Sequence, residues 1–182
     1  MPLPRLSAAH TEGLVQEVTT YIGRQQQTYR ATSEPLNSGQ KNVLRPFFPE
    51  PTLDLTRLVV LTGQRVHNPP FYDDLRKMGF EEAALPDFSL MAAITFVDTV
   101  VSYQPLEARL LFHELVHVVQ YERLGVAEFA MKYVNGFLSG GSYETIPLEM
   151  NAYELDGWFA AAPTNAFSVA SEVGAWIAGG RF

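Results

Sequence analysis

The sequence predicts an α+β domain in which a small β-sheet packs on one side of a buried helix and further helices follow toward the C-terminus. Two short segments rich in β-branched and other apolar residues, 57–62 and 92–102, have the pattern of strands. Segment 105–124 places apolar residues on nearly every side of a helix, which is typical of a helix buried in a core. Two more helical segments, 147–161 and 164–179, follow it.

The composition narrows the classes of function. The chain has 182 residues, of which 47% are hydrophobic, and a net charge of −7. Because its 13 Lys and Arg residues are scattered along the chain, we expect neither a nucleic-acid partner nor an anionic membrane surface. The absence of cysteine excludes disulfides, thiolate ligands and thiol nucleophiles, so any metal must be held by histidine and carboxylate side chains.

The chain is expected to be soluble. It has no apolar run of the roughly 18 residues that a membrane span requires. Its first residues, Met-Pro-Leu-Pro-Arg-Leu, lack the apolar stretch of a secretory signal, which favours a cytoplasmic location, although export by a signal-less route is compatible with the sequence.

Residues 1–51 are predicted to form an appendage to a main domain at 52–182, or a pro-segment that covers its cleft. Segment 7–30 has an amphipathic helical pattern, with Thr11 as the candidate N-cap and an apolar stripe made of Leu14, Val15, Val18, Tyr21 and Ile22. Segment 31–51 is rich in proline and turn residues. We expect a linker, or an ordered loop held by Phe47 and Phe48.

The middle of the chain should supply the sheet. The strand predicted at 57–62 ends at Gly63. A second strand is predicted at 92–102, because alternate residues such as Ile94 and Phe96 give it one partly apolar face. Between them we expect a loop at Asn68-Pro69-Pro70 and a short helix at 72–78 that ends at Gly79.

Helix boundaries follow from proline and glycine. Pro105 suits the first turn of the buried helix, and Gly125 is its expected stop. A short helix at 126–137 should end at Asn135-Gly136, with a flexible turn at 139–142. Pro147 and Thr164 are the expected starts of the last two helices.

The buried helix contains the motif His113-Glu114-Leu115-Val116-His117. Histidines four residues apart lie about 40° apart around a helix, so both imidazoles can reach one metal ion. Glu114 lies about 100° from His113, beside the pair, where a general base for a metal-bound water belongs. The alternative is a pair of hydrogen-bonded core histidines. Burying Glu114 unpaired would cost several kcal/mol, which favours the metal site.

A catalytic zinc ion takes three protein ligands, so a third ligand is required. No histidine follows His117, and the positions three and six residues later are Gln120 and Arg123, which excludes a motif extended by a third histidine. His10 and His67 lie upstream and are expected on the surface or in loops. His67 is the reserve candidate for the third ligand. The third ligand should therefore be a carboxylate, chosen from Glu122, Glu128, Glu144, Glu149, Glu154, Asp156 and Glu172.

Helix geometry favours Glu149. On a helix that begins near Pro147, Glu149 lies on the inward, largely apolar face, whereas Glu154 lies on the opposite, solvated face. The alternatives are Glu144 as the ligand, or a buried ion pair of Glu149 with one of two basic residues, Arg109 and Arg123.

Two neighbours share the face of Glu149. Tyr153 and Asp156 could orient His113 or His117 from behind. Core packing of Tyr153 and an ordinary surface charge at Asp156 are equally compatible with the pattern.

The pattern Leu-Leu-Phe-His113-Glu114-Leu-Val-His117-Val-Val-Gln, followed by Pro-Leu-Glu149-x-x-Ala-Tyr, resembles the gluzincin zinc metallopeptidases, most closely small bacterial members with a minimal catalytic core. The resemblance covers residues 90–160. It implies a zincin-like fold, Zn²⁺ held by the two histidines and Glu149, and Glu114 as the base. It also implies that an edge strand at 94–100 pairs with an extended peptide or protein substrate.

Two departures from that family affect the predicted catalysis. Thermolysin-like members hold the first histidine with an aspartate four residues after the ligand glutamate, where this chain has Tyr153, and Asp156 is the candidate replacement. They also use a downstream histidine to stabilise the oxyanion, a role that would fall here to Tyr143, Tyr133 or Tyr153. We therefore expect zinc-dependent peptide hydrolysis, with a non-catalytic, zinc-stabilised binding or toxin-associated module as the alternative. The sequence does not determine the oligomeric state.

Overall fold

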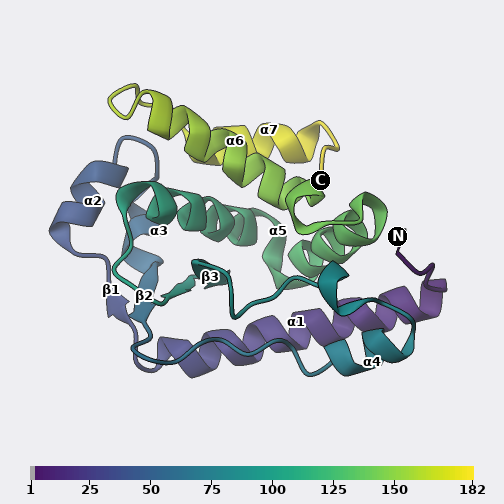
Figure 1. The fold of residues 1–182 in the computed structure, drawn as a ribbon. Coiled ribbons are helices and arrows are strands. Elements are labelled where there is room, and N and C mark those ends of the chain that lie inside the picture. Colours follow the sequence, from purple (N-terminus) through teal and green to yellow (C-terminus); the bar gives the residue numbers. More distant parts are fainter. Residues whose placement is uncertain (1–2) are drawn as a thin grey trace.

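A computed structural model describes residues 3–182, so the first two residues of the predicted segment 1–51 lie outside the described part. The fold is a mixed α and β fold, as expected (Figure 1). The helices are α1 (Ala8–Arg30), α2 (Ser38–Leu44), α3 (Glu50–Leu55), α4 (Tyr72–Lys77), α5 (Ala108–Gly140), α6 (Pro147–Ala161) and α7 (Val169–Ala178). The strands are β1 (Glu34–Pro35), β2 (Arg57–Val60), β3 (Ala93–Phe96) and β4 (Thr99–Ser102), and two short 3₁₀ helices are η1 (Glu82–Ala84) and η2 (Tyr143–Thr145).

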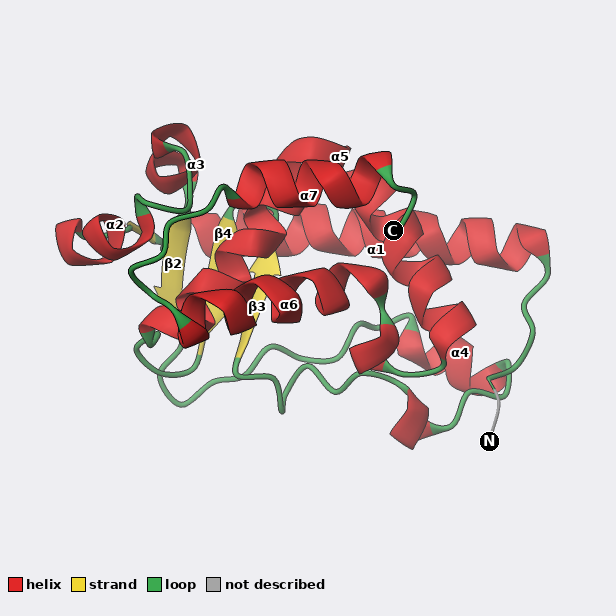
Figure 2. Ribbon diagram, turned by 90° about the horizontal axis from the view of Figure 1, so that it is seen from above, coloured by secondary structure: helices red, strands yellow, loops and turns green. Residues whose placement is uncertain are grey.

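Helix α5 lies at the centre of the molecule. Strand β3 and helix α1 contact it on one side, and α6 and α7 contact it on the other (Figure 1). Figure 2, seen from the side of α6 and α7, shows both helices lying over α5 and the strands. The first half of α5 is buried on all sides from Leu111 to Tyr121, which explains its nearly continuous apolar sequence.

The sheet has the order β1-β2-β4-β3, in which β2 and β4 are parallel and the other pairs are antiparallel. The single strand predicted at 92–102 is wrong, because the chain reverses at Val97-Asp98 and forms a β3–β4 hairpin. Val97 has a φ of 62°. The apolar–polar alternation breaks at this point, because Phe96 and Val97 are both apolar and Asp98 and Thr99 are both polar, but Val97-Asp98 lacks the glycine that usually marks a two-residue hairpin turn.

Contacts with α1 hold this turn. Asp98 is 6% exposed. It accepts hydrogen bonds from Gln26 Nε2 at 3.0 Å and Thr99 Oγ1 at 3.0 Å, and it pairs with Arg30. A buried carboxylate is tolerated here because these partners compensate its lost hydration.

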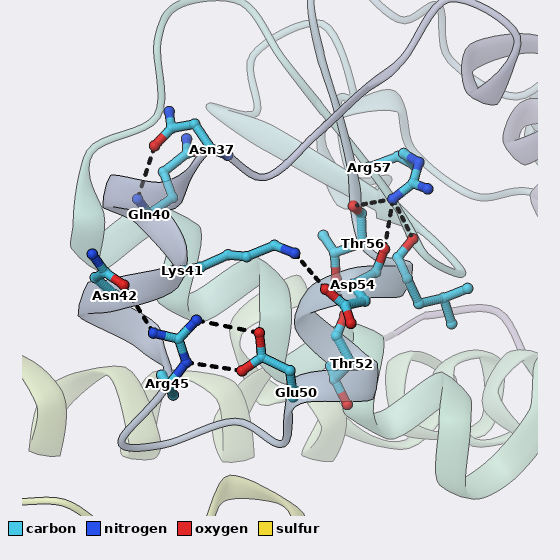
Figure 3. A network of polar contacts seen from close by, with 11 residues as sticks. Asn37, Gln40, Lys41, Asn42, Arg45, Glu50, Thr52, Asp54, Thr56 and Arg57 are labelled. Carbon is cyan, nitrogen blue, oxygen red and sulfur yellow. Dashed lines mark hydrogen bonds and ion pairs between the residues drawn. The ribbon is translucent and has the colours of Figure 1, made fainter.

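Segment 31–51 is more regular than its composition suggested. Phe47 and Phe48 are buried, as expected, and both pack edge-on against Phe112 of α5. The segment also contains α2 and the start of α3, which were not predicted. Local polar contacts hold these short helices: Asn37 and Gln40 form a reciprocal capping box, and an Arg45–Glu50 ion pair links α2 to α3 (Figure 3).

Two predicted N-caps are wrong by one turn. Helix α1 begins earlier, because Ser7 rather than Thr11 accepts a hydrogen bond from a backbone N–H, that of His10 at 3.2 Å. Helix α7 begins later, at Ser168 rather than Thr164. Each segment offers several residues that can cap, and packing selects among them.

Glycines shape the second half of α5. The predicted stop at Gly125 is a sharp break, with φ 74° and ψ 164°, after which the helix resumes. The predicted stop at Asn135-Gly136 is wrong, because the helix continues to Gly140. The turn predicted at 139–142 is confirmed in its second half, where Gly141, with a φ of 82°, ends the helix. A Cβ at Gly136 would lie 2.6 Å from Pro147 Cδ. This glycine therefore permits the close contact that places the start of α6 beside α5.

Within residues 3–182, none of the helices combines the length and the apolar character needed to cross a membrane.

Candidate metal centre

The structure brings together the three predicted metal ligands. His113 and His117 lie on α5, Glu149 lies in the first turn of α6, and all three are buried. His113 Nε2 and His117 Nε2 are 3.3 Å apart. Glu149 Oε2 lies 3.5 Å from the former nitrogen and 3.4 Å from the latter. The three atoms thus form a nearly equilateral triangle.

This triangle fits a metal ion. Ligands at about 2.0–2.2 Å in tetrahedral geometry are separated by about 3.3–3.6 Å, which matches the three distances. Glu149 Oε2 is buried and has no hydrogen-bond partner among the described residues. Such an oxygen is costly to bury. A cation bound by the three atoms would compensate it, so His113, His117 and Glu149 could hold a metal ion.

Asp156 supports His113 from behind. Its Oδ2 lies 2.9 Å from His113 Nδ1, which is one of the two histidine contacts that the sequence allowed for this residue. Its Oδ1 accepts hydrogen bonds from Arg109 at 3.0 Å and 2.7 Å. Asp156 is 4% exposed, so its interpretation as a surface charge is wrong. The contact leaves Nε2 of His113 directed toward the centre.

Gln120 supports His117 in the same way, a role that we did not predict. Gln120 is fully buried, and its Oε1 lies 2.9 Å from His117 Nδ1. Its Nε2 donates to Leu148 O at 2.9 Å and Asn151 Oδ1 at 3.0 Å, which fixes the orientation of the amide. His117 Nδ1 must therefore carry a proton, so Nε2 is the nitrogen that can bind a metal once it is deprotonated. A glutamine three residues after His117 on a buried helix was the available signal.

Glu114 is held by strand β3. Thr95 Oγ1 lies 2.7 Å from Glu114 Oε2 and donates a hydrogen bond to it, and the same hydroxyl lies 3.3 Å from Glu114 O. The carboxylate is 4% exposed. The hydroxyl thus offsets part of the cost of burying it. Thr95 was predicted only as a strand residue, because nothing local indicates which helix residue it faces.

The electrostatics of the site favour bound positive charge. Burial alone would raise the pKa of Glu149, but the charge of His117 and the polar contacts with both imidazoles lower it to about 2. Burial alone would lower the pKa of His113, but the contacts with Asp156 and Glu149 raise it to about 10. Burial alone would also lower the pKa of His117, but the charge of Glu149 and its polar contact with the ring raise it. A metal ion would have to displace these protons.

A cavity of about 120 Å³ reaches Glu114, His117 and Glu149 from the side of α1. Tyr133 and Tyr143 line it, and so does Tyr121, which was not among the predicted residues. Burial, followed by the charge of Glu149, raises the pKa of all three phenols, so they remain protonated donors. Tyr153 lies elsewhere, 46% exposed, with its ring 4.6 Å from that of His113.

The alternatives to Glu149 do not hold. Glu144, His10 and His67 are exposed and lie outside the ligand cluster. The proposed ion pairs of Glu149 are also wrong, because Arg109 pairs with Asp156 and Arg123 donates to Ala170 O at 3.4 Å.

Comparison with family models, with curated proteins and with solved structures found no match to this chain.

Proposed function

We propose that this protein is a zinc-dependent metallopeptidase of the gluzincin type, with a zincin-like fold, that hydrolyses peptide bonds. One observation carries the proposal: the ligand atoms of His113, His117 and Glu149 have tetrahedral spacing, and Glu114 adjoins them on the same cavity. A metal triad with an adjacent carboxylate is the arrangement that hydrolysis by an activated water requires.

Zinc is the metal that this donor set favours. Two imidazole nitrogens and one carboxylate, without thiolates, are the ligands of open catalytic zinc sites. Asp156 and Gln120 would keep both imidazoles in the tautomer that binds through Nε2. A zinc ion held there supplies Lewis acidity toward a carbonyl oxygen and toward a water molecule.

Glu114 is proposed as the general base. Its carboxylate accepts a proton from the attacking water and passes it to the leaving amine. Thr95 donates a hydrogen bond to Oε2 of Glu114, so Oε1 is the oxygen available to accept the proton. The Glu114 carboxylate is 4% exposed, and its hydrogen-bond partner within residues 3–182 is the hydroxyl of Thr95.

Tyrosine hydroxyls would stabilise the oxyanion in place of the absent downstream histidine. Tyr133 and Tyr143 face the same cavity as Glu114 and remain protonated. Tyr153 contacts the ring of His113 but does not line this cavity. We therefore assign the role to Tyr143 or Tyr133 in preference to Tyr153.

Strand β3 is proposed to bind the substrate backbone. It is the outermost strand of the sheet, next to β4 on one side only, and it contacts α5. An extended peptide could add to this edge with its scissile bond near the metal residues.

The test is Glu114→Gln in the zinc-loaded protein. We expect it to retain zinc and to lose hydrolysis of a casein-type substrate by about 10²–10⁴-fold, the range for loss of a general base. Glu128→Gln, an exposed carboxylate of the same helix, is the matched control and should keep full activity.

Full activity in Glu114→Gln would contradict the mechanism. If the unmodified protein binds zinc but neither hydrolyses casein nor binds a hydroxamate, the non-catalytic, zinc-stabilised module is the better description, since a closed site leaves no position for the inhibitor.

A further inference from the structure

The cavity beside the metal residues is apolar over most of its wall. Helix α1 contributes Leu14, Val18 and Ile22, the second half of α5 contributes Phe129 and Phe137, and Phe88 closes it from the loop before β3. Glu114, His117 and Glu149 form one end. The cavity therefore has an apolar body and a polar end where the proposed chemistry takes place.

The size of the cavity indicates what it can hold. Its volume of about 120 Å³ is slightly below the roughly 150 Å³ of an engineered cavity that binds benzene. Protein interiors are normally filled to crystal density, and no side chain of residues 3–182 fills this space. A single aromatic ring, or an aliphatic side chain of similar size, fits the volume and the lining, whereas a long acyl chain exceeds both.

Helix α1 forms one wall of this cavity and is attached to the rest of the fold by polar contacts. Tyr21 donates a hydrogen bond from its hydroxyl to His67 O at 3.2 Å. Farther along the helix, Gln26 and Arg30 both bind Asp98 in the β3–β4 turn. The wall is thus attached to the hairpin that holds Glu114 through Thr95.

We propose that this cavity binds one aromatic or similarly large apolar side chain of the peptide substrate, and that Val18 of α1 limits its size. That the bound side chain belongs to a peptide substrate rests on the proposed peptidase function. Segment 1–51 then contributes to substrate selection, and it is not a cover that must be removed for activity. Val18 is half-buried and lines the cavity. A substitution at this one position therefore alters the cavity volume without changing any metal ligand.

Binding can be tested separately from catalysis. Toluene is titrated into the full-length, zinc-loaded protein, and saturable binding is followed by ligand-observed NMR. We expect the unmodified protein to bind toluene and Val18→Trp to bind it at least tenfold more weakly. Thr20→Trp, which adds a tryptophan at an exposed position of the same helix, should bind as the unmodified protein does.

Val18→Ala enlarges the cavity and serves if Val18→Trp does not fold. It should improve naphthalene binding relative to toluene by at least threefold. Absence of saturable toluene binding, unchanged binding in a folded Val18→Trp, or stronger binding of n-octane than of toluene would each overturn the proposal. None of these measurements depends on hydrolysis, so they can fail while the peptidase proposal stands.

The second measurement is the selectivity among peptide substrates. In peptides that differ at one position next to the scissile bond, kcat/KM should be at least tenfold higher for Phe than for Ala, the range that one pocket can discriminate. Val18→Trp should reduce this ratio to near one, whereas Thr20→Trp should preserve it. Equal kcat/KM for Phe and Ala in an active enzyme would overturn the assignment of the cavity to the substrate.

Discussion

Asp156 Oδ2 lies 2.9 Å from His113 Nδ1, although 43 positions separate the two residues in the chain. The same carboxylate accepts two hydrogen bonds from Arg109, which stands one turn before His113 on α5. This contact joins α5 to α6 behind the metal residues and holds the His113 ring with Nε2 toward Glu149.

Replacing Asp156 by Asn should weaken zinc binding about 10–100-fold, the usual effect of removing a carboxylate behind a metal-binding histidine. The neutral amide would neither strengthen the basicity of His113 nor balance the charge of Arg109. Competition with a chromogenic chelator measures the affinity. Glu154→Gln, an exposed carboxylate of the same helix, is the control. An Asp156→Asn affinity equal to that of Glu154→Gln would show that Asp156 has no such role.

Replacing Gln120 by Leu should lower the free energy of unfolding by at least about 2 kcal/mol, because His117 Nδ1, Leu148 O and Asn151 Oδ1 would lose buried partners. Urea denaturation of the metal-free protein measures the effect apart from zinc binding. Gln16→Leu on the exposed face of α1 should change stability by less than about 0.5 kcal/mol. Similar stabilities of the two variants would exclude a structural role for the Gln120 amide.

Replacing Gly125 by Ala should cost about 1–3 kcal/mol of stability, because its φ of 74° with ψ of 164° is a conformation that residues with a Cβ avoid. Gly13→Ala is the matched change in a regular, exposed part of α1, where nothing lies near the new Cβ. It should stabilise the protein by up to about 1 kcal/mol. Thermal denaturation should therefore move the two midpoints in opposite directions, and a shared direction would contradict the break at Gly125.

Zinc at 100 times its dissociation constant should stabilise the folded protein by about 2.7 kcal/mol. For a chain of this length that corresponds to a rise in Tm of about 5–10 °C. Glu149→Gln should lose most of this rise, because a neutral amide is a poor zinc ligand. Glu144→Gln, an exposed glutamate five residues earlier, should keep all of it. Full zinc stabilisation of Glu149→Gln would mean that the third ligand lies elsewhere.

Local spacing was enough to predict the residues of the metal cluster. His113 and His117 share a face of α5 because of the helical repeat, and Glu149 was selected because its helix buries that face. The position of Asp156 on the same helix face also made it a candidate to orient one of the histidines. Helix geometry did not identify Gln120, Thr95 or Tyr121, because tertiary contacts place them. Gln120 binds Leu148 and Asn151 of α6, Thr95 binds Glu114 of α5, and Tyr121 lines the cavity.

The sequence by itself determined the α+β class, the buried helix with its two histidines, and the glycine break at residue 125, because periodicity and backbone sterics act over a few neighbouring residues. Only the tertiary structure decided that residues 92–102 form a hairpin, that Gly136 admits Pro147, and that α1 lines the cavity. These features depend on which segments meet in space. Only the meeting of α5 and α6 could place Glu149 within 3.5 Å of both imidazoles.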